Sequence, residues 1–157
     1  MAYKTNFKNT IWAGGAGAFL HADVQEGIVG SSQSTQPGKL VVDDAELKNP
    51  TSFTKNKALK VVLERTSNTG GTLEDVFTEG ELIEVAFPRS GELFNLLMGP
   101  SNSVSVGNLV TANTANEEGY ISIYTGSEED ILSTNLFEAL EAVSASTSAQ
   151  LVLCKKL

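Results

Sequence analysis

The feature of this sequence that most constrains its fold is a series of short apolar runs separated by turn-forming residues. After residue 38 these runs are bounded by Gly, Pro, Asn and Asp, which is typical of β-strands joined by tight turns. The expected strands lie at residues 40–42, 58–64, 82–87, 93–98, 104–106, 109–111, 120–124 and 150–154. The sequence therefore predicts a mainly β protein, built as a small antiparallel β-barrel or β-sandwich.

Residues 135–143 do not fit this strand pattern by local rules. Apolar residues fall at positions 136, 137, 140 and 143, the segment is rich in helix formers, and Ser133, Thr134 or Asn135 could cap a helix. Helix propensity is a weak preference that strand pairing often overrides. Local rules therefore predict a helix here, and a strand is the open alternative.

Residues 1–36 differ in composition from the rest of the chain. They are rich in Gly, Ala, Ser, Thr, Asn and Gln, and residues 30–38 have the composition of a flexible linker that ends in a Pro-Gly turn. We therefore divide the chain into an extended N-terminal arm at residues 1–36 and a β domain at residues 37–157. Removal of residues 1–36 is expected to leave a folded β domain.

The predicted arm contains four aromatic residues, Tyr3, Phe7, Trp12 and Phe19. Large aromatic side chains supply contact area when they dock on a partner. These four residues are therefore the candidate interface residues. Packing of the same rings against their own domain is the alternative.

The length of 157 residues and the net charge of −8 limit the class of protein. At this length one domain, with or without an arm, can bury a sufficient core without a disulfide or a metal. The single cysteine, Cys154, can form no internal disulfide. Because an acidic protein is repelled by nucleic acid and by anionic lipid, we expect neither nucleic acid nor a membrane as a partner.

Residues suited to catalysis or metal binding are few. The only histidine is His21, in the predicted arm, so a Ser-His-Asp or Cys-His arrangement would lack a rigidly held base. Zinc sites draw three or four ligands mainly from Cys and His. Carboxylates cluster at residues 43–46, 117–118 and 128–130 in expected turns, where solvated charge is the simpler interpretation and a weak calcium site is the alternative. We expect no enzymatic activity, no cofactor and no metal.

Several short motifs follow one another in order after residue 36. They are Pro-Gly-Lys-Leu-Val at 37–41, Val-Leu-Glu at 62–64, Asp-Val-Phe-Thr-Glu-Gly-Glu-Leu at 75–82, Pro-Arg-Ser-Gly-Glu at 88–92, Val-Ser-Val-Gly-Asn-Leu-Val at 104–110, Ala-Leu-Glu-Ala-Val at 139–143 and Gln-Leu-Val-Leu at 150–153. In this order the motifs resemble those of the small capsid decoration (cement) proteins of tailed bacteriophages. The resemblance covers about three quarters of the chain, and it departs from the family pattern in the long arm and at residues 111–118.

This resemblance implies a fold and a function. It implies a β-tulip-like barrel or sandwich, in which residues 137–143 form a strand that pairs with the last strand. It also implies a structural virion protein on the outer capsid surface, where it would clamp adjacent subunits of the major capsid protein. A homotrimer at the capsid three-fold positions is expected, with the aromatic residues of the arm in contact with neighbouring subunits.

A receptor- or carbohydrate-binding module of a phage fibre or tail tip is the alternative function. Such a β-barrel module would use exposed aromatic rings near Asp or Asn, and Tyr120 and Tyr124 form the obvious pair. Tyr120 and Tyr124 are alternate residues of an expected strand, and such residues often face the core. A structural role in the virion is therefore favoured over sugar binding.

Overall fold

The structure is a computed structural model of the chain. It describes residues 10–15, 22–51, 54, 57–65, 72–115, 117–126 and 135–157. In these residues the named secondary-structure elements are all β-strands. The predicted mainly β fold is confirmed.

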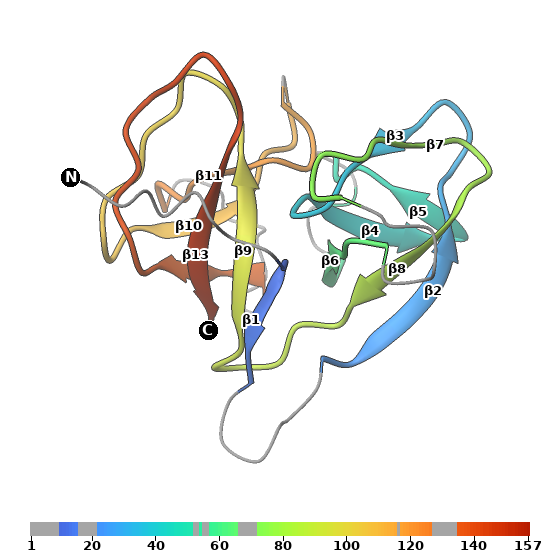
Figure 1. The fold of residues 1–157 in the computed structure, drawn as a ribbon, viewed down its shortest axis with the longest axis horizontal. Helices are drawn as coiled ribbons and strands as arrows, with labels where there is room; N and C mark the ends of the chain where they lie inside the picture. Colours follow the sequence, from blue (N-terminus) through green and yellow to red (C-terminus); the bar gives the residue numbers. More distant parts are fainter. Residues whose placement is uncertain are drawn as a thin grey trace.

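Most of the carboxyl-terminal half of the chain forms a closed barrel, here named barrel A (Figure 1). Its sheet contains β1 (Trp12–Gly14), β9 (Leu93–Met98), β10 (Leu109–Ala112), β11 (Ile121–Ile123), β12 (Phe137–Ala139) and β13 (Gln150–Lys156), in the order β1-β9-β11-β10-β12-β13. β13 also pairs with β9, so that β9, β11, β10, β12 and β13 close into a ring, with β1 paired to β9 outside it. Closure removes the free edges that an open sheet has to protect.

Alternate side chains of β9 and β13 fill barrel A. Phe94 and Leu96 are fully buried and lie opposite Cys154 and Val152 in the antiparallel ladder. Phe94 also meets Phe137 of β12 edge to face, with the ring centres 6.5 Å apart. Each such buried side chain contributes about 1.5–3 kcal/mol to stability. The inward and outward faces of β9 thus follow from the period of two in a strand.

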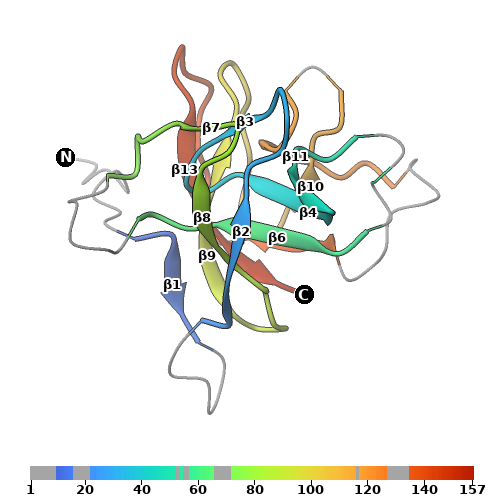
Figure 2. The same cartoon turned by 90° about the vertical axis from the view of Figure 1, so that its right-hand side faces the viewer.

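A second sheet, here named sheet B, lies beside barrel A (Figures 1 and 2). It contains β2 (Val24–Ile28), β4 (Leu40–Asp44), β5 (Glu46–Lys48), β6 (Leu59–Val62) and β8 (Leu82–Ala86), in the order β2-β8-β6-β4-β5. Val29, directly after β2, forms an isolated parallel bridge with Leu47 of β5. Sheet B therefore curls until its two outer strands meet. A short pair, β3 (Ser34–Thr35) with β7 (Phe77–Thr78), completes the strands.

Two strands of sheet B, β4 at residues 40–42 and β6 at residues 59–62, are buried on both faces. In β4, Leu40 and Val42 belong to the large core that includes the interior of barrel A, whereas Val41 belongs to a smaller core within the curl of sheet B. β6 divides in the same way, with Val61 in the large core and Val62 in the small one. This double burial explains why residues 40–42 form a continuous apolar run without alternation. The large core joins sheet B to barrel A.

Residues 137–143 form extended structure, as the resemblance implies. β12 pairs with β13 through Ala139↔Cys154 and with β10 through Val110↔Phe137. Val143 then forms an isolated bridge with Val104. The strand expected at residues 104–106 is otherwise absent, because residues 105–108 form a turn. Pairing on both sides of β12 outweighs the local helix preference of this segment.

The structure differs from the predicted arm at residues 22–36. β2 pairs with β8 and β3 pairs with β7, and Val29 and Thr35 are buried. The Gly30 N–H donates a hydrogen bond of 2.9 Å to the carbonyl oxygen of Leu47. The predicted flexible linker at residues 30–38 is therefore wrong. Its backbone groups pair with distant strands, and composition does not reveal such pairing.

Within the described residues, the strands before and after the predicted boundary at residues 36 and 37 pair with each other and share the same cores. Deletion of residues 1–36 would remove β1, β2 and β3 and would uncover both cores. The loss of these strands is a structural argument against the expectation that this deletion leaves a folded domain, and that expectation stays a prediction. Residues 1–9 and 16–21, which include Tyr3, Phe7, Phe19 and His21, lie outside the described residues.

Candidate interaction surfaces

Trp12 belongs to the four predicted interface residues and lies in the described part of the chain. It is opposite Phe94 in β1 and packs, partly buried, against the large core. Its indole Nε1 is enclosed and has no hydrogen-bond partner among the described residues. Trp12 thus makes contacts within its own chain. Contact of Trp12, Tyr3, Phe7 and Phe19 with a partner stays a prediction.

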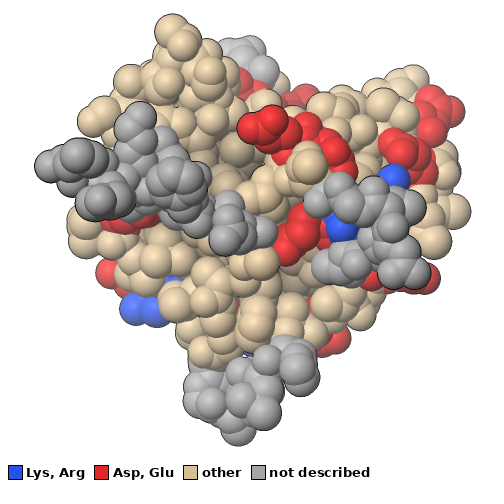
Figure 3. Space-filling view, viewed as in Figure 1, with Lys and Arg blue, Asp and Glu red and all other residues tan. Residues whose placement is uncertain are grey.

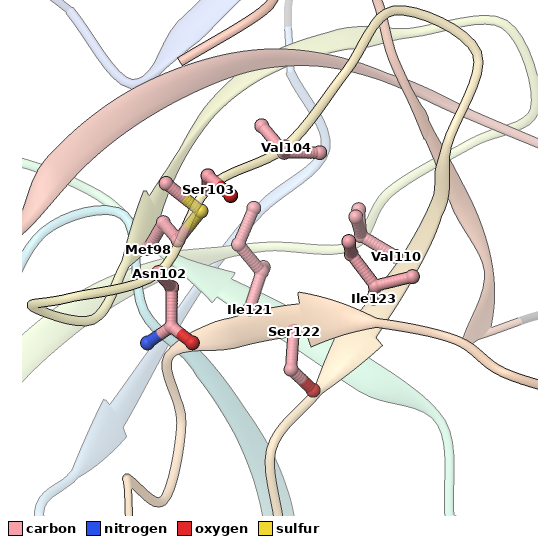
Figure 4. Close-up of a pocket in the computed structure, with 8 residues that line it drawn as sticks. All are labelled: Met98, Asn102, Ser103, Val104, Val110, Ile121, Ser122 and Ile123. Atoms are coloured by element: carbon pink, nitrogen blue, oxygen red, sulfur yellow. The ribbon is translucent and has the colours of Figure 1, made fainter. Parts of the chain in front are cut away.

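The wall of barrel A has a hollow beside β11. β11 pairs with β9 at Ile121↔Met98, and the segment that holds Val104 lies across the neighbouring part of the wall. The hollow has a volume of about 120 Å³ and is lined by Met98, Asn102, Ser103, Val104, Val110, Ile121, Ser122 and Ile123. Ile121 points toward Val104, with Met98 on one side and Val110 and Ile123 on the other (Figure 4). Because most of these side chains are apolar, the hollow suits an apolar group of a partner.

Three aliphatic side chains are exposed at this end of barrel A. Val106 is 65% exposed, Ile123 is 43% exposed and Leu109 is 36% exposed. Leu109 and Ile123 lie on adjacent strands but on opposite faces of their ladder, because Ile123 is opposite Val110, and Val106 precedes Leu109 by one tight turn. We name these three residues, together with the hollow, the barrel-mouth surface. Apolar side chains exposed at the same end of a barrel as a hollow are a feature of protein interaction sites.

A well-ordered turn presents Val106. The Asn108 N–H donates to the Ser105 carbonyl oxygen at 3.1 Å, and the Ser105 N–H donates to Asn108 Oδ1 at 2.9 Å. Gly107 has a φ of +86°, a conformation that other residues rarely adopt, and its N–H donates to the carbonyl oxygen of Ala139. The turn predicted at Gly107 and Asn108 is confirmed. A pre-ordered turn loses less conformational entropy when Val106 binds a partner.

A second exposed surface lies on one face of β2 and β8. Its three cross-strand pairs are, in order, Val24↔Ala86, Glu26↔Glu84 and Ile28↔Leu82. Val24, Ile28 and Leu82 are about half exposed, whereas Ala86 is buried. We name these three pairs the β2–β8 ladder. The ladder is an apolar surface with two carboxyl groups at its centre.

The sequence contains a signal for the β2–β8 ladder, although residues 24–28 fall in the predicted arm. Residues 24, 26 and 28 alternate apolar, acidic and apolar, and residues 82, 84 and 86 repeat this alternation. Alternate residues of a strand share a face, so each segment predicts a strand with an acid between two apolar residues. Only the pairing of β2 with β8 brings these two faces together.

A hollow of about 140 Å³ adjoins the ladder and is lined by Glu26, Leu63, Arg65, Phe77, Leu82, Ile83 and Glu84. The Arg65 guanidinium lies 3.2 Å from the Glu81 carboxylate and 5.1 Å from the centre of the Phe77 ring. The Thr78 N–H donates to Glu81 and lowers the pKa of that carboxyl group. Acidic side chains are more numerous over the half of this face that holds sheet B than over barrel A (Figure 3). This part of the molecule therefore favours a basic partner.

The carboxylates at residues 43–46 lie in the β4–β5 hairpin and contact cations or backbone groups. Lys60 Nζ lies 3.1 Å from Asp43, and Glu46 accepts a hydrogen bond from the Ser31 N–H. Lys57 bonds to Asp44 and holds its pKa below the ordinary value. Within the residues that the structure describes, no group of three or more His, Cys, Asp or Glu could hold a metal ion. Residues 128–130 lie outside the described residues.

Tyr120 and Tyr124, the pair considered for carbohydrate binding, directly precede and follow β11, and both are half-buried. Lys39 Nζ lies 4.1 Å from the centre of the Tyr120 ring and covers that ring face. Burial, and to a smaller extent Glu117, raises the pKa of Tyr120. Because a sugar-binding platform needs open ring faces, this geometry gives Tyr120 and Tyr124 little support as a binding pair.

Comparison with solved structures found a similar fold in a bacteriophage protein. No family model and no curated protein matches the chain. The N base of the head fiber protein gp8.5 of bacteriophage phi29 is similar in structure, with 12% sequence identity and a TM-score of 0.44. The likeness covers 85% of this chain and 98% of that one, and it concerns the fold alone. Among the described residues, no helix has the length and hydropathy needed to cross a membrane.

Proposed function

We propose that this protein is a structural component of a bacteriophage virion. It binds the outer surface of the capsid and stabilises the shell by clamping adjacent subunits of the major capsid protein. The observation that carries the proposal is the barrel-mouth surface, where Val106, Leu109 and Ile123 are exposed beside an apolar hollow on a closed barrel. Such a surface provides adhesion and requires no chemical reaction.

The motifs that resemble capsid decoration proteins have structural roles that support this proposal. In Pro-Gly-Lys-Leu-Val at 37–41, Gly38 has a φ of +88°, and its carbonyl oxygen accepts a hydrogen bond of 2.8 Å from the Leu97 N–H. A β-carbon at Gly38 would lie 3.2 Å from the Asn95 carbonyl oxygen, so a larger residue would strain this approach. The motif thus joins sheet B to β9 of barrel A.

The Pro-Arg-Ser-Gly-Glu motif at 88–92 forms the connection from sheet B to barrel A. Glu92 is fully buried, and its carboxylate accepts hydrogen bonds from the Arg89 side chain at 2.6 Å and from the Arg89 N–H at 2.8 Å. A buried carboxylate is stable only when it is paired in this way. The motifs at 37–41 and 88–92 therefore define one framework, which would hold the barrel-mouth surface in a fixed orientation.

Capsid binding by such a framework would stabilise the shell by mass action. A molecule that binds only the assembled state shifts the equilibrium toward assembly. Burial of three half-exposed aliphatic side chains supplies roughly 1 kcal/mol or more each, and many copies on one shell add to this effect. Closed symmetry favours cyclic association of three copies at the capsid three-fold positions, which is the oligomeric state we propose.

The proposal is tested by co-sedimentation with expanded heads of the phage that encodes this protein. Val106→Asp should weaken head binding at least about tenfold, because it places a charge in an apolar contact. The matched control is Val76→Asp, since Val76 is also an exposed valine, at 58%, but lies next to β7 of the short β3–β7 pair, outside the strands of barrel A. It should bind as the wild type does.

Two results of this experiment would contradict the proposal in different ways. If the wild-type protein does not sediment with heads under any condition that preserves its fold, the proposed function is wrong. If the wild type binds and Val106→Asp binds equally well, the function stands but the barrel-mouth surface is not the contact. Circular dichroism of both variants checks that the β fold is intact.

A further inference from the structure

A further hollow lies where sheet B meets barrel A. Its volume is about 230 Å³, which is larger than that of either hollow described above. Sheet B forms one side of it and barrel A the other, and the main walls are Leu59, Phe87, Pro88, Asn135, Lys156 and Leu157. We name it the junction hollow. Neither region forms this hollow alone.

The junction hollow has a buried floor and an accessible rim. Leu59, Asn135 and Lys156 are buried. Phe87 and Leu157, in contrast, are 38% and 40% exposed. A group from a partner can therefore enter the hollow from solvent and lose its contact with water there, mainly against apolar side chains.

Hydrogen bonds between the two regions hold the floor of the junction hollow in place. Asn135 Oδ1 accepts from the Leu59 N–H at 3.1 Å, and Asn135 Nδ2 donates to the Lys57 carbonyl oxygen at 2.8 Å. The Lys156 N–H donates to the carbonyl oxygen of Glu92 at 2.8 Å. A site that is formed before its partner arrives loses less conformational entropy on binding.

Lys156 carries the one charged side chain among the described residues that line the junction hollow. Its Nζ donates to the main-chain oxygen of Leu157 at 2.6 Å and lies 5.6 Å from the centre of the Phe137 ring. Burial lowers the pKa of Lys156, because apolar surroundings disfavour the charged amine. A carboxylate bound in the hollow would offset this cost and would accept a charge-assisted hydrogen bond from the amine.

The volume of the junction hollow indicates the size of the group that it can hold. An apolar cavity of about 150 Å³ binds benzene, whereas pockets that enclose a whole small-molecule ligand have about 300–1,000 Å³. A hollow of about 230 Å³ therefore suits one aromatic side chain of a larger partner. Aromatic anchors set in such pockets supply much of the binding energy of protein interfaces.

We propose that the junction hollow binds a polypeptide segment of a partner protein in which an aromatic side chain stands next to a carboxylate. The ring packs against Leu59 and Pro88, with Phe87 at the rim. The carboxylate pairs with the amine of Lys156. The partner is thus recognised by apolar area and by negative charge together, although the chain as a whole is acidic.

The junction hollow and the barrel-mouth surface lie at opposite ends of the β9–β13 ladder. One end of this ladder is Gln150↔Met98, and Met98 lines the hollow of the barrel-mouth surface. The other end is Lys155↔Leu93, next to Lys156. The two sites therefore do not overlap. Binding at the junction hollow goes beyond the proposed function and does not depend on it.

Short peptides added to the isolated, isotope-labelled protein test this contact by nuclear magnetic resonance. The probe is acetyl-Gly-Phe-Asp-Gly-amide, and its matched control is acetyl-Gly-Phe-Asn-Gly-amide, which lacks the carboxylate. The Asp peptide should shift the amide resonances of Leu59 and Leu157 with a dissociation constant of about 1 mM, and the Asn peptide should bind at least about tenfold more weakly. An Asp peptide with Ala in place of Phe should not bind, because the hollow then stays unfilled.

Two lysine variants test the role of Lys156. Lys156→Met removes the charge and keeps much of the side-chain volume, a change that a buried charge tolerates without loss of the fold. It should abolish the preference for the Asp peptide over the Asn peptide. Lys155→Met is the matched control, because Lys155 is partly exposed and pairs with Glu138 at 3.0 Å. It should leave the preference unchanged.

A third variant closes the hollow itself. Ala58 lines the junction hollow and is exposed, so Ala58→Phe would place a ring there without removal of a core side chain. This variant should no longer bind the Asp peptide. Ala115→Phe, at another exposed alanine, should bind it as the wild type does.

Several results would overturn the proposal. Equal affinity of the wild type for the Asp and Asn peptides would refute the ion pair, and the absence of shifts at about 10 mM peptide would refute the site. Shifts of the same resonances on concentration of the protein alone would show a second copy as the occupant. None of these results bears on head binding, which Val106→Asp tests separately.

Discussion

Barrel A and sheet B close in different ways. In barrel A, β13 pairs with β9 continuously from Gln150↔Met98 to Lys155↔Leu93. In sheet B, β2 and β5 meet through the bridge Val29↔Leu47 and the neighbouring hydrogen bond from Gly30 to Leu47. A continuous ladder has to open cooperatively, whereas a single bridge can open locally.

The interiors of the two sheets differ as well. Barrel A contains an aromatic pair, Phe94 and Phe137, between aliphatic residues. In sheet B the largely buried Lys60 extends toward polar groups, with its Nζ 3.1 Å from Asp43 and 3.0 Å from Gln25. Ion pairs with an exposed partner contribute little stability. The comparison indicates that barrel A is the rigid framework, and that sheet B depends on the core it shares with barrel A.

The largest expected difference between the two regions concerns their buried phenylalanines. Phe94→Ala should lower the free energy of unfolding by about 4–5 kcal/mol, because Phe94 is fully buried in the large core. Phe77→Ala deletes the same side chain from the small core, next to the hollow, where the surroundings can relax, so we expect about 3 kcal/mol. Urea unfolding of both variants measures these values. A larger loss for Phe77→Ala would reverse the comparison.

A smaller effect is expected at Asn135, which joins the two regions. Its Oδ1 accepts from the Leu59 N–H at 3.1 Å, its Nδ2 donates to the Lys57 carbonyl oxygen at 2.8 Å, and its carbonyl oxygen accepts from Thr111. Asn135→Ala should cost about 1–3 kcal/mol, because buried backbone groups lose their partner. Hydrogen exchange at the Leu59 amide should accelerate.

The matched control for Asn135 is Asn113→Ala. Asn113 Oδ1 accepts one hydrogen bond, from the exposed Ala115 N–H, so this change should cost about 0.5 kcal/mol or less. Equal losses of stability for the two variants would contradict the assignment of Asn135 as the link between sheet B and barrel A.

The smallest expected effect is the pH dependence contributed by Glu81. Its pKa is lowered by the hydrogen bond from the Thr78 N–H, so its stabilising contribution is complete above the ordinary glutamate pKa of about 4.3. The contribution is lost as the pH falls through the lower pKa of the folded state. Glu81→Gln should therefore lower the Tm by about 1–2 °C at pH 7 and by less at pH 3. A Tm difference that is independent of pH would contradict this assignment.

Much of the strand content could be predicted from local sequence. The apolar runs at residues 82–87, 93–98 and 150–154 all contain strands of the structure, and Pro88 follows the end of β8 as expected. β2 lacks a continuous apolar run, because Gln25, Glu26 and Gly27 separate Val24 from Ile28, and the alternation of residues 24, 26 and 28 is its one local signal. Its strand conformation depends on pairing with β8, which lies far along the chain.

The candidate surfaces were less predictable than the strands. The tight turn at Gly107 was recognisable from the Gly-Asn pair, because a positive φ requires such residues. The exposure of Val106, Leu109 and Ile123 was not, because an isolated valine or leucine is more often buried. Which aliphatic residues stay at the surface depends on how far neighbouring strands cover them.

The sequence by itself determined the mainly β class, the positions of many turns and the short length of the strands, because backbone preferences and apolar periodicity act within a few residues. The tertiary structure alone decided that residues 22–36 belong to the fold, that β12 is a strand, and which face of each strand is covered. Those outcomes depend on hydrogen bonds and packing between segments that are distant in the chain, such as β9 with β13 and β2 with β8. Local preference is too weak to determine them.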